Sequence, residues 1–430
     1  MLQDNLTVND AGHLAVAGVD TVTLAEQYGT PLYVMDEARL RGNMRVYAEA
    51  MRSFPAGSMA YYASKALSFK EIYRIAAEEG IGADVVSGGE LYTALAAGFP
   101  AEKIGFHGSA KTEAEICYAV ESGVGYIIAD NPEELRRISR IASEKGVLQQ
   151  VLLRLTPGID PHTFDAVNTG RVDSKFGVAI ETGQADEFVR FALSLPGLTV
   201  KGFHCHIGSQ IAEPKPFTDA AEIMTAYMAK IRDELGYTAS VLNLGGGIGV
   251  PYEEGDPAPD AGAILRDIAA YMKARCAALA LPQPAVFVEP GRGIVGDAGV
   301  TLYTVENVKT IPGYKSYISI DGGMGDNPRF ALYGAIHTVL NASRAGEQAD
   351  FVADVAGRCC ESDDLIRPDA RLQHTEAGDT LAVLVTGAYN YAMASNYNRV
   401  PRPPIVMLRD GASRVVLRRE TYEDLVACDV

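Results

Sequence analysis

Several residues capable of chemistry stand where short β-rich runs of this sequence end. They include Lys65 in YYASKAL, the carboxylates Asp84 and Glu289, and the imidazoles of His107 and His206. An unperturbed lysine has a pKa of about 10.4 and is almost entirely protonated at neutral pH. Desolvation and neighbouring charge favour an amine that can form an imine. The set therefore indicates covalent amine chemistry, although Lys65 alone is explained as well by a solvent-facing lysine.

A glycine-rich stretch at 244–249, LGGGIG, is a candidate anion site. It does not match the dinucleotide fingerprint G-x-G-x-x-G, because the sixth position is Val250, and no Walker sequence occurs in the chain. Backbone N–H groups of glycines can approach an anion without obstruction by Cβ. Together with EPGRG at 289–293, the stretch suits the phosphate site of a barrel enzyme. A plain tight turn is the alternative.

A pair of histidines and a pair of cysteines also carry reactive groups, but the sequence gives each pair more than one interpretation. His204 and His206 are alternate residues of one run, but no HExxH motif or acidic metal cluster accompanies them, so no metal site is predicted. Core packing is the alternative for His204, and a neutral imidazole can instead stack on a flat ring. Cys359 and Cys360 are adjacent, and a disulfide at that spacing is strained, so buried structural thiols are expected.

Chemistry at strand ends requires an architecture that brings those ends together. Eight β-rich runs alternate with helix-period segments through the first two thirds of the chain. The runs are 59–65, 83–87, 103–108, 126–130, 151–155, 200–208, 241–247 and 286–291. Eight β/α units in about 235 residues match a closed (β/α)8 TIM-type barrel, whose reactive residues lie at the carboxyl ends of the strands. An open doubly wound sheet is the alternative.

Spacing and capping residues predict the helices between these runs. Apolar residues at 224, 228, 231 and 235 share one helical face, as do those at 265, 268, 272 and 276. Gly80 and Gly146 are predicted to follow helix ends, and Asn131-Pro132 to start a helix.

The last third of the chain has the pattern of an all-β domain. Strands without regular helices between them are predicted at 299–311, 316–323, 350–357, 379–389 and 413–419. Residues 6–18 form a predicted hairpin that joins them. The sequence therefore predicts a barrel over 29–296, and a β-sandwich or β-barrel domain from 1–28 and 297–430 that completes the active site.

Composition argues against some classes of binding partner and against a membrane or secreted location. The 38 Lys and Arg against 55 Asp and Glu give a net charge of −17, which argues against binding nucleic acid, because phosphate binding needs a basic face. No apolar run is long enough for a membrane span, and residues 1–10 lack the features of a secretory signal. Six cysteines at irregular positions form no disulfide framework. A cytoplasmic protein with no membrane partner is expected.

Seven sequence blocks resemble those of the diaminopimelate decarboxylase family, pyridoxal 5'-phosphate enzymes of the alanine-racemase-like barrel class. The blocks are YYASKAL, HIGSQ (206–210), GGGIG, EPGR (289–292), DGGMGDNPR (321–329), CCESDD (359–364) and GAYNYAMASNYNRVPRP (387–403). They occur in the family's order between residues 61 and 403. The resemblance implies a barrel followed by a C-terminal β domain, in a head-to-tail homodimer with shared active sites.

The resemblance also implies roles for individual residues. Lys65 would carry the cofactor as an internal aldimine, His206 would stack on its ring, and Glu289 would pair with the pyridine nitrogen. Further cofactor-binding positions are Asp84, Arg154, Ser209, Gly245, Gly246, Gly247, Gly291, Arg292 and Tyr389. Substrate-binding positions are Arg292, Arg329, Tyr333, Glu361 and Tyr389, and Cys360 and Glu361 would reach into the partner's site.

The implied roles agree with elementary chemistry. A carboxylate at Glu289 keeps the pyridine nitrogen protonated, which makes the ring a strong electron sink and favours decarboxylation over racemisation. Cys360, with an ordinary pKa of about 8.5, is a plausible general acid. Arg329 would repel a distal ammonium but bind a distal carboxylate, while Glu361 could hold a distal amine.

The expected reaction is therefore the conversion of the amino diacid meso-2,6-diaminopimelate to L-lysine and CO2, the last step of bacterial lysine biosynthesis. A related decarboxylase of another basic amino acid is one alternative. A catalytically silent regulatory homologue is another, although such proteins usually lose the lysine or the cysteine, and both are present here. In CESDD, Asp363 replaces the family's usual glycine, a change that aspartate tolerates if the position needs a positive φ.

Overall fold

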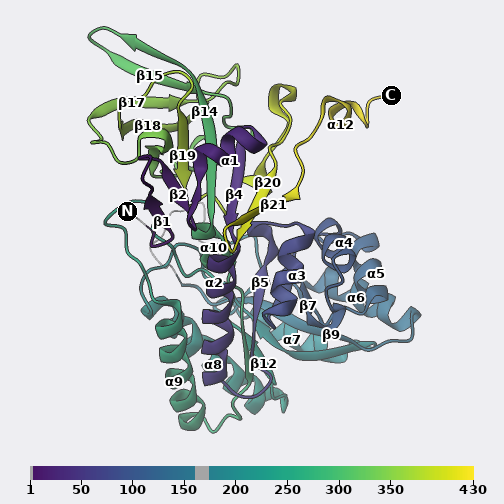
Figure 1. Ribbon diagram of the computed structural model, residues 1–430. Helices are drawn as coiled ribbons and strands as arrows, with labels where there is room; N and C mark the ends of the chain where they lie inside the picture. The colour runs from purple at the N-terminus through teal and green to yellow at the C-terminus, as the bar shows by residue number, and fades with distance from the viewer. Residues whose placement is uncertain (1–2, 160–173) are drawn as a thin grey trace. The chain divides into compact units, whose positions relative to one another are not determined.

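The structure is a computed structural model that describes residues 3–159 and 174–430. The chain forms two compact units, drawn in Figure 1. The barrel unit comprises Asn43–Gly249 and Ala258–Gly293, and the β unit comprises Met1–Gly42, Val250–Pro257 and Ile294–Val430.

Parallel strands of the barrel unit close into a ring. The order around it is β5, β6, β7, β8, β9, β11, β12 and β13, and β13 pairs back to β5. The bounds are β5 Met59–Ala63, β6 Gly82–Val85, β7 Ile104–Phe106, β8 Tyr126–Ala129, β9 Gln149–Thr156, β11 Leu198–His204, β12 Val241–Asn243 and β13 Ala285–Val288. A short strand, β10 Val178–Ala179, also pairs with β9. Each predicted run overlaps one ring strand, so the TIM-type barrel is confirmed and the open sheet is excluded.

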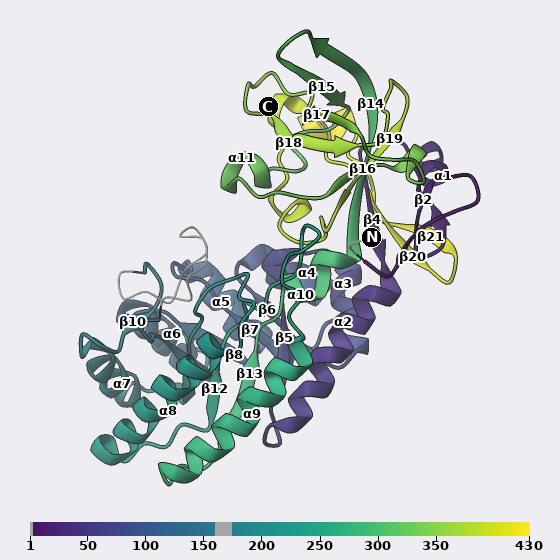
Figure 2. The same ribbon diagram turned by 90° about the vertical axis from the view of Figure 1, so that its left-hand side faces the viewer.

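Helices lie outside the ring, as Figure 2 shows for α7, α8 and α9. Their bounds are α2 Glu37–Ala50, α3 Lys70–Glu78, α4 Gly88–Ala96, α5 Glu113–Ser122, α6 Pro132–Glu144, α7 Gln184–Ser194, α8 Lys215–Leu235, α9 Ala261–Ala278 and α10 Arg292–Val295. The predicted start of α6 is confirmed, because the Asn131 side chain accepts the Glu134 N–H at 2.9 Å and Pro132 opens the helix.

Side chains from separate strands fill the inside of the ring. Tyr61, Ile128, Leu152, Val241 and Phe287 form one buried cluster, and the Tyr61 and Phe287 ring centroids lie 5.0 Å apart. These residues come from β5, β8, β9, β12 and β13, so they meet only because they point inward. The barrel is therefore a packed core, and residues at the carboxyl ends of the strands stand on a rigid floor.

The β unit is built around β14 (Gly299–Ile311), the long strand in Figure 1. One sheet has the order β18-β17-β15-β14-β4-β20-β21, and β19 pairs with both β14 and β16. The bounds are β4 Leu32–Asp36, β15 Lys315–Ile320, β16 Val339–Asn341, β17 Phe351–Ala356, β18 Leu365–Leu372, β19 Thr380–Leu384, β20 Ile405–Arg409 and β21 Ala412–Leu417. Three short strands form a second sheet, β1 Leu6–Val8, β2 Leu14–Val16 and β3 Val19–Asp20. The helices are α1 Thr21–Tyr28, α11 Arg329–Tyr333 and α12 Tyr422–Val426.

Two features of the β unit differ from the sequence prediction. The barrel was expected to begin at residue 29, but β4 pairs with β14 and β20 and so belongs to the β unit. The strands β3, β4, β16, β18 and β20 were not predicted. β18 contains Pro368 and three charged residues in LIRPDARL, which obscure its apolar alternation, and β16 has only three residues.

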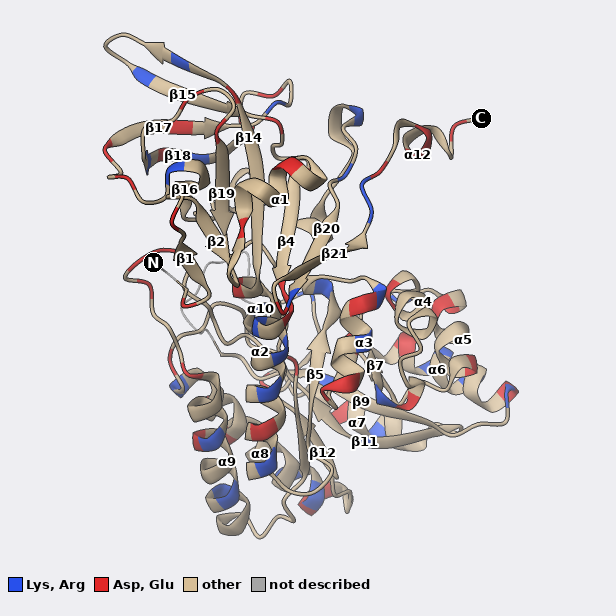
Figure 3. Cartoon of the chain, in the orientation of Figure 1, with Lys and Arg blue, Asp and Glu red and all other residues tan. Residues whose placement is uncertain are grey.

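Charged residues of both signs are interspersed on the barrel helices, as Figure 3 shows for α8 and α9. Lys215 pairs with Asp219 at 2.8 Å along α8, and Arg275 of α9 lies 3.5 Å from Glu222 of α8. Such exposed pairs add little stability but keep these surfaces hydrated. Within the described residues, no helix is long and apolar enough to cross a membrane.

Candidate active site

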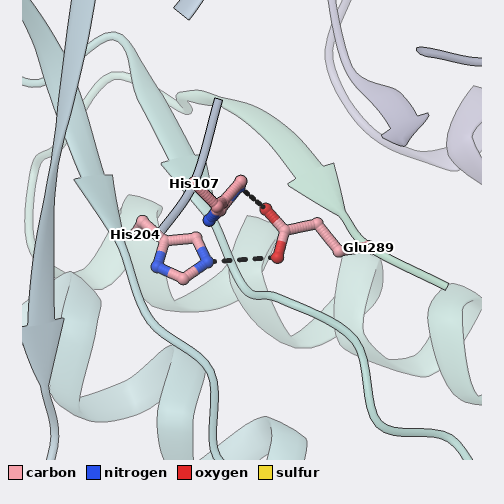
Figure 4. A group of neighbouring side chains, drawn as sticks. All are labelled: His107, His204 and Glu289. Atoms are coloured by element: carbon pink, nitrogen blue, oxygen red, sulfur yellow. Dashed lines mark hydrogen bonds and ion pairs between the residues drawn. The ribbon is translucent and has the colours of Figure 1, made fainter. Parts of the chain in front are cut away.

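A buried carboxylate, Glu289, stands directly after β13 with three hydrogen-bond donors around it. Its Oε1 lies 2.8 Å from His107 Nε2 and 2.6 Å from Asn243 Nδ2, and its Oε2 lies 3.2 Å from His204 Nε2. Figure 4 shows both imidazoles pointing at the carboxylate. Burial alone would raise the pKa of Glu289, but the two histidines lower it well below its ordinary value. Glu289 is therefore an anion in the interior.

The two histidines act as donors to that anion. Their rings meet edge to face, with centroids 4.9 Å apart. Burial lowers the pKa of His204 to about 4 despite the nearby Glu289, so His204 is neutral and carries its proton on Nε2. The ligand atoms of His107, His204 and Glu289 all lie within 4.8 Å of one another, a spacing that could hold a metal ion. Each Nε2 instead faces a carboxylate oxygen at hydrogen-bond distance, which suits fixing Glu289; the absence of a metal stays a prediction.

A second carboxylate, Asp84, ends β6 beside the same imidazole. Its Oδ1 lies 3.6 Å from His107 Nε2, beyond hydrogen-bond distance. Burial raises the pKa of Asp84 to about 7, and the positive charges of His107 and Lys65 offset that only in part. The two carboxylates flanking His107 thus differ, since Glu289 is held ionised while Asp84 takes up a proton near neutral pH.

Lys65 follows β5 in a short 3-10 turn, Ser64–Ala66, with an exposed side chain. Burial raises the pKa of Asp84 and of Glu90, and the charge of Lys65 offsets part of that rise. The same charge opposes protonation of His206. Ser64 Oγ beside it lies 2.7 Å from Glu90 Oε2. The amine is therefore accessible to a ligand while standing at the carboxyl end of the ring beside the groups predicted to share its site.

The glycine loop at 245–247 has no room for side chains. A Cβ at Gly246 would lie 2.0 Å from the carbonyl oxygen of Glu289, and one at Gly247 would lie 2.2 Å from that of Gly208. Gly245 and Gly247 also have φ values of +70° and +121°. Close packing against the segments that follow β11 and β13 explains why three successive glycines occur here.

Two of the three backbone N–H groups of this loop are not available to a phosphate group, contrary to the prediction. The Gly245 N–H donates to Asn243 Oδ1 at 2.9 Å, and the Gly246 N–H donates to His206 Nδ1 at 3.2 Å. Only the Gly247 N–H has no acceptor within the part of the chain that the structure describes. Of the three predicted anion donors, Gly245 and Gly246 are therefore engaged elsewhere.

His206 is a neutral ring at the same rim. Burial, followed by the charges of Lys65 and Arg154, lowers its pKa well below the ordinary value. Its Nδ1 accepts from Gly246, so its proton stays on Nε2. A neutral imidazole fixed through one nitrogen can stack on a flat ring, as predicted.

Cationic groups complete the barrel-unit site. Arg292, at the start of α10, is 6 % exposed, and its guanidinium lies 3.1 Å from Ser209 Oγ. Gly291 before it packs closely, because a Cβ there would lie 3.1 Å from the Ala63 carbonyl oxygen. Arg154 of β9 lies over the Phe176 ring, 4.4 Å from its centroid.

The remaining predicted residues belong to the β unit. Arg329, the first residue of α11, is 8 % exposed and donates to the Tyr252 hydroxyl at 3.1 Å. Its guanidinium carbon lies 5.3 Å from the Tyr252 ring centroid and 5.9 Å from that of Tyr389, whose φ is +61°. The structure thus brings together Arg329 and Tyr389 as predicted, while Tyr333 at the end of α11 is 46 % exposed.

Cys360 and Glu361 lie in the turn between β17 and β18. The Cys360 N–H donates to Asn398 Oδ1 at 2.8 Å, and the Glu361 carboxylate accepts from the Tyr397 hydroxyl at 3.4 Å. Cys360 is exposed, whereas burial and the adjacent Asp364 raise the pKa of Cys359 to about 11. The two neighbouring thiols therefore differ in accessibility. Asp363 does not adopt a positive φ, so the aspartate in CESDD causes no backbone strain.

Sequence reasoning missed three residues of these sites. Asn243 is a polar residue at the end of an apolar strand, a signal that could have been used. His204 was considered only as a metal ligand or as a packed core residue. Tyr252 gave no signal, because it follows a loop of no regular pattern and meets Arg329 only through the fold.

The sequence and the fold are similar to those of known proteins of one enzyme family. Residues 39–296 match the family of the pyridoxal-dependent decarboxylases, pyridoxal binding domain. The diaminopimelate decarboxylase of Bacillus subtilis (strain 168) is 44 % identical over 98 % of this chain and 96 % of its own, and that of Staphylococcus aureus (strain COL) is 42 % identical over 98 % of each. A crystal structure of diaminopimelate decarboxylase from M. jannaschii with L-lysine has a TM-score of 0.92 at 35 % identity, covering 100 % of this chain and 99 % of that one.

The chain belongs to the diaminopimelate decarboxylase family, within the pyridoxal-dependent decarboxylases. It is therefore an enzyme of the lyase class that uses pyridoxal phosphate. Its own residues fit that cofactor. Glu289 is ionised and accepts three hydrogen bonds, and a carboxylate has about four acceptor positions, which leaves one for a ring N–H. Gly247, Ser209 and Arg292 offer donors for a phosphate group.

The raised pKa of Asp84 predicts a pH dependence of stability in the cofactor-free protein. The folded state keeps the Asp84 proton up to about pH 7, whereas the unfolded state loses it near pH 3.8. This stabilisation is complete below pH 3.8 and is lost as the pH rises to 7, by up to about 1.4 kcal/mol per pH unit. Asp84→Asn should remove that slope in urea unfolding measured from pH 4 to pH 7.

Asp10→Asn, at an exposed turn, is the matched control and should follow the wild type at every pH. Parallel stability curves for wild type and Asp84→Asn would show that Asp84 ionises normally.

Proposed function

We propose that this enzyme decarboxylates meso-2,6-diaminopimelate to L-lysine and CO2, the last step of bacterial lysine biosynthesis. The observation that carries the proposal is the buried, ionised Glu289, joined by an accessible lysine at the same rim. The relatives of 42–44 % identity bear the name diaminopimelate decarboxylase, and the M. jannaschii structure contains L-lysine. L-lysine is the product that this reaction would leave.

Pyridoxal phosphate, when bound, accepts the electron pair released as CO2 leaves the α carbon. Lys65 would supply the amine that holds it, and Glu289 would accept a hydrogen bond from the protonated ring nitrogen. His206 would stack on the ring. Ser209, the Gly247 N–H, Gly291 and Arg292 would bind the phosphate group, with Asp84, Arg154 and Tyr389 as further cofactor contacts.

The substrate is recognised by its distal amino acid group. Arg329, with a planar guanidinium already oriented by Tyr252, binds the distal carboxylate in a charge-assisted pair. Arg292, Tyr333 and Tyr389 also contact the substrate, and Glu361 holds the distal ammonium. This pair of charges favours an amino diacid over lysine or ornithine, which lack the distal carboxylate.

Reprotonation of the α carbon is assigned to Cys360 of the partner subunit, with Glu361, in a homodimer whose active sites are shared. Cys360 is exposed and its neighbour Cys359 is not, which supports choosing the second thiol. An exposed thiol can reach the partner's site and act as a general acid there. A cytoplasmic location remains part of the proposal.

Lysine formation tests the function directly. Wild-type protein supplied with pyridoxal phosphate should turn yellow and form L-lysine from meso-diaminopimelate. Lys65→Ala should lose the visible absorbance and more than about 10³-fold of kcat, because no amine holds the cofactor. Lys70→Ala, an exposed lysine at the start of α3, should retain both. A colourless wild-type protein, or one that forms CO2 only from lysine or ornithine, would refute the proposed reaction.

Substrate discrimination should depend on Arg329. Arg329→Gln is expected to raise KM for diaminopimelate about 10–100-fold, the worth of one charge-assisted pair, while the visible absorbance stays unchanged. Steady-state kinetics of lysine release measure this. Arg371→Gln, an exposed arginine of β18, serves as the control. An unchanged KM in Arg329→Gln would mean that another group binds the distal carboxylate.

Sharing of active sites can be tested by mixing inactive subunits. Lys65→Ala and Cys360→Ala homodimers should each be nearly inactive. After mixing and subunit exchange, a heterodimer contains one site with both wild-type residues, so about a quarter of wild-type activity should return when exchange is random. Absence of any recovery, with exchange verified by mass spectrometry, would mean that Cys360 serves its own chain.

A further inference from the structure

Asn243 is the last residue of β12 and is 3 % exposed. Its Nδ2 donates to Glu289 Oε1 at 2.6 Å, and its Oδ1 accepts the Gly245 N–H at 2.9 Å. We propose that Asn243 is a positioning residue for the decarboxylation, linking the carboxylate at the cofactor nitrogen to the glycine loop. The inference rests on the proposed role of Glu289.

The orientation of the Asn243 amide is set by its two partners. The Gly245 N–H can only donate, so it must face the amide oxygen. The ionised Glu289 can only accept, so it must face the amide nitrogen. A flipped amide would place oxygen against oxygen and nitrogen against N–H in a buried site, and would leave both partners unsatisfied. The side chain therefore holds Glu289 in one defined position.

The glycine loop supplies a rigid reference for that position. A Cβ at Gly245 would lie 2.7 Å from the Cys205 carbonyl oxygen, so the loop backbone is packed against the end of β11. The Gly245 carbonyl oxygen also accepts the Glu289 backbone N–H at 2.8 Å. Both the backbone and the side chain of Glu289 are thus tied to Gly245, the latter through Asn243.

The same loop fixes the predicted stacking ring. The Gly246 N–H donates to His206 Nδ1 at 3.2 Å, one residue along from the Gly245 N–H that orients Asn243. One short stretch of backbone therefore orients both the carboxylate for the ring nitrogen and the imidazole for the ring face. Displacement of Asn243 should disturb the first of these more than the second.

An amide differs from the other two donors because it does not titrate. An imidazole is a titratable donor, and burial lowers the pKa of His204 to about 4. Asn243 donates in every protonation state of the site. It also makes the shortest of the three contacts to Glu289, at 2.6 Å against 2.8 Å and 3.2 Å. This makes it the donor best placed to hold Glu289 ionised and aligned.

Two substitutions separate the two bonds of Asn243. Asn243→Asp keeps an acceptor for Gly245 but places a second carboxylate against Glu289, so the pair must share a proton or separate. We expect the holoenzyme to keep its visible absorbance with a shifted maximum, and kcat to fall at least about 10-fold with KM changed less than about threefold. Asn243→Leu removes both bonds, and should in addition weaken pyridoxal phosphate retention in dialysis at least about 10-fold.

Non-additivity with Glu289 distinguishes positioning from a general structural effect. Because Asn243 acts through Glu289, the double variant Asn243→Asp with Glu289→Gln should lose no more kcat than Glu289→Gln alone. The control is Asn341→Asp, another buried asparagine that donates to an aspartate, Asp379, at 2.8 Å in the β unit. It should lower thermal stability without shifting the absorbance maximum.

An unchanged kcat and absorbance maximum in Asn243→Asp would overturn the inference, as would losses that multiply in the double variant. Failure of the proposed function is seen separately, because it would leave the wild-type protein without cofactor absorbance or lysine formation.

Discussion

A buried carboxylate that must stay charged is the constraint around which the barrel unit is arranged. Removing Glu289 from water favours its neutral form, so a functional anion needs donors in compensation. His107 of the loop after β7, His204 of β11 and Asn243 of β12 supply them from separate strands. Because these strands are fixed by the closed ring, the donors are already directed at the carboxylate.

That convergence explains features that are not themselves reactive. The inward cluster of Tyr61, Leu152 and Phe287 packs the ring and holds the strand ends in register. The glycines at 245–247 let the loop after β12 lie against the backbone of Cys205, Gly208 and Glu289, where a Cβ would collide with a carbonyl oxygen. Close packing of the loop therefore strengthens the electrostatic interactions of Glu289. A looser loop would let water reach the carboxylate and weaken those interactions.

Periodicity and residue type predicted most of the architecture. All ring strands and the start of α6 follow from local pattern, because parallel strands buried on both faces are continuous apolar runs. The boundary predicted at residue 29 was wrong because LYVMD gives no sign of which unit it joins, and only the pairing of β4 with β14 shows that it belongs to the β unit. β18 escaped because Pro368 and its charges mask an edge strand. Local sequence does not encode which distant strand supplies the partner.

Some residues of the candidate site were predicted from the sequence, and others could be found only in the structure. Lys65, Glu289 and His206 were predicted because they end apolar runs and match family motifs, whereas the roles of Asn243 and His204 depend on a hydrogen-bond geometry that spans three strands. Likewise, the anion donors Gly245 and Gly246 looked free in the sequence, but their N–H groups orient Asn243 and His206. Motif spacing identifies which residues meet, but not which of their atoms are already bonded.

Tyr252, a few residues beyond the glycine loop, orients Arg329. The backbone that leaves the glycine loop enters the β unit at Val250 and brings Tyr252 to Arg329. Tyr252 in turn meets His337 edge to face at 4.9 Å, and its carbonyl oxygen accepts from Thr338 at 2.8 Å, so its ring has little freedom. An arginine held on a fixed ring loses less side-chain entropy when it binds a carboxylate than a mobile one does. The segment that begins by orienting Glu289 therefore ends by orienting the group proposed to select a diacid.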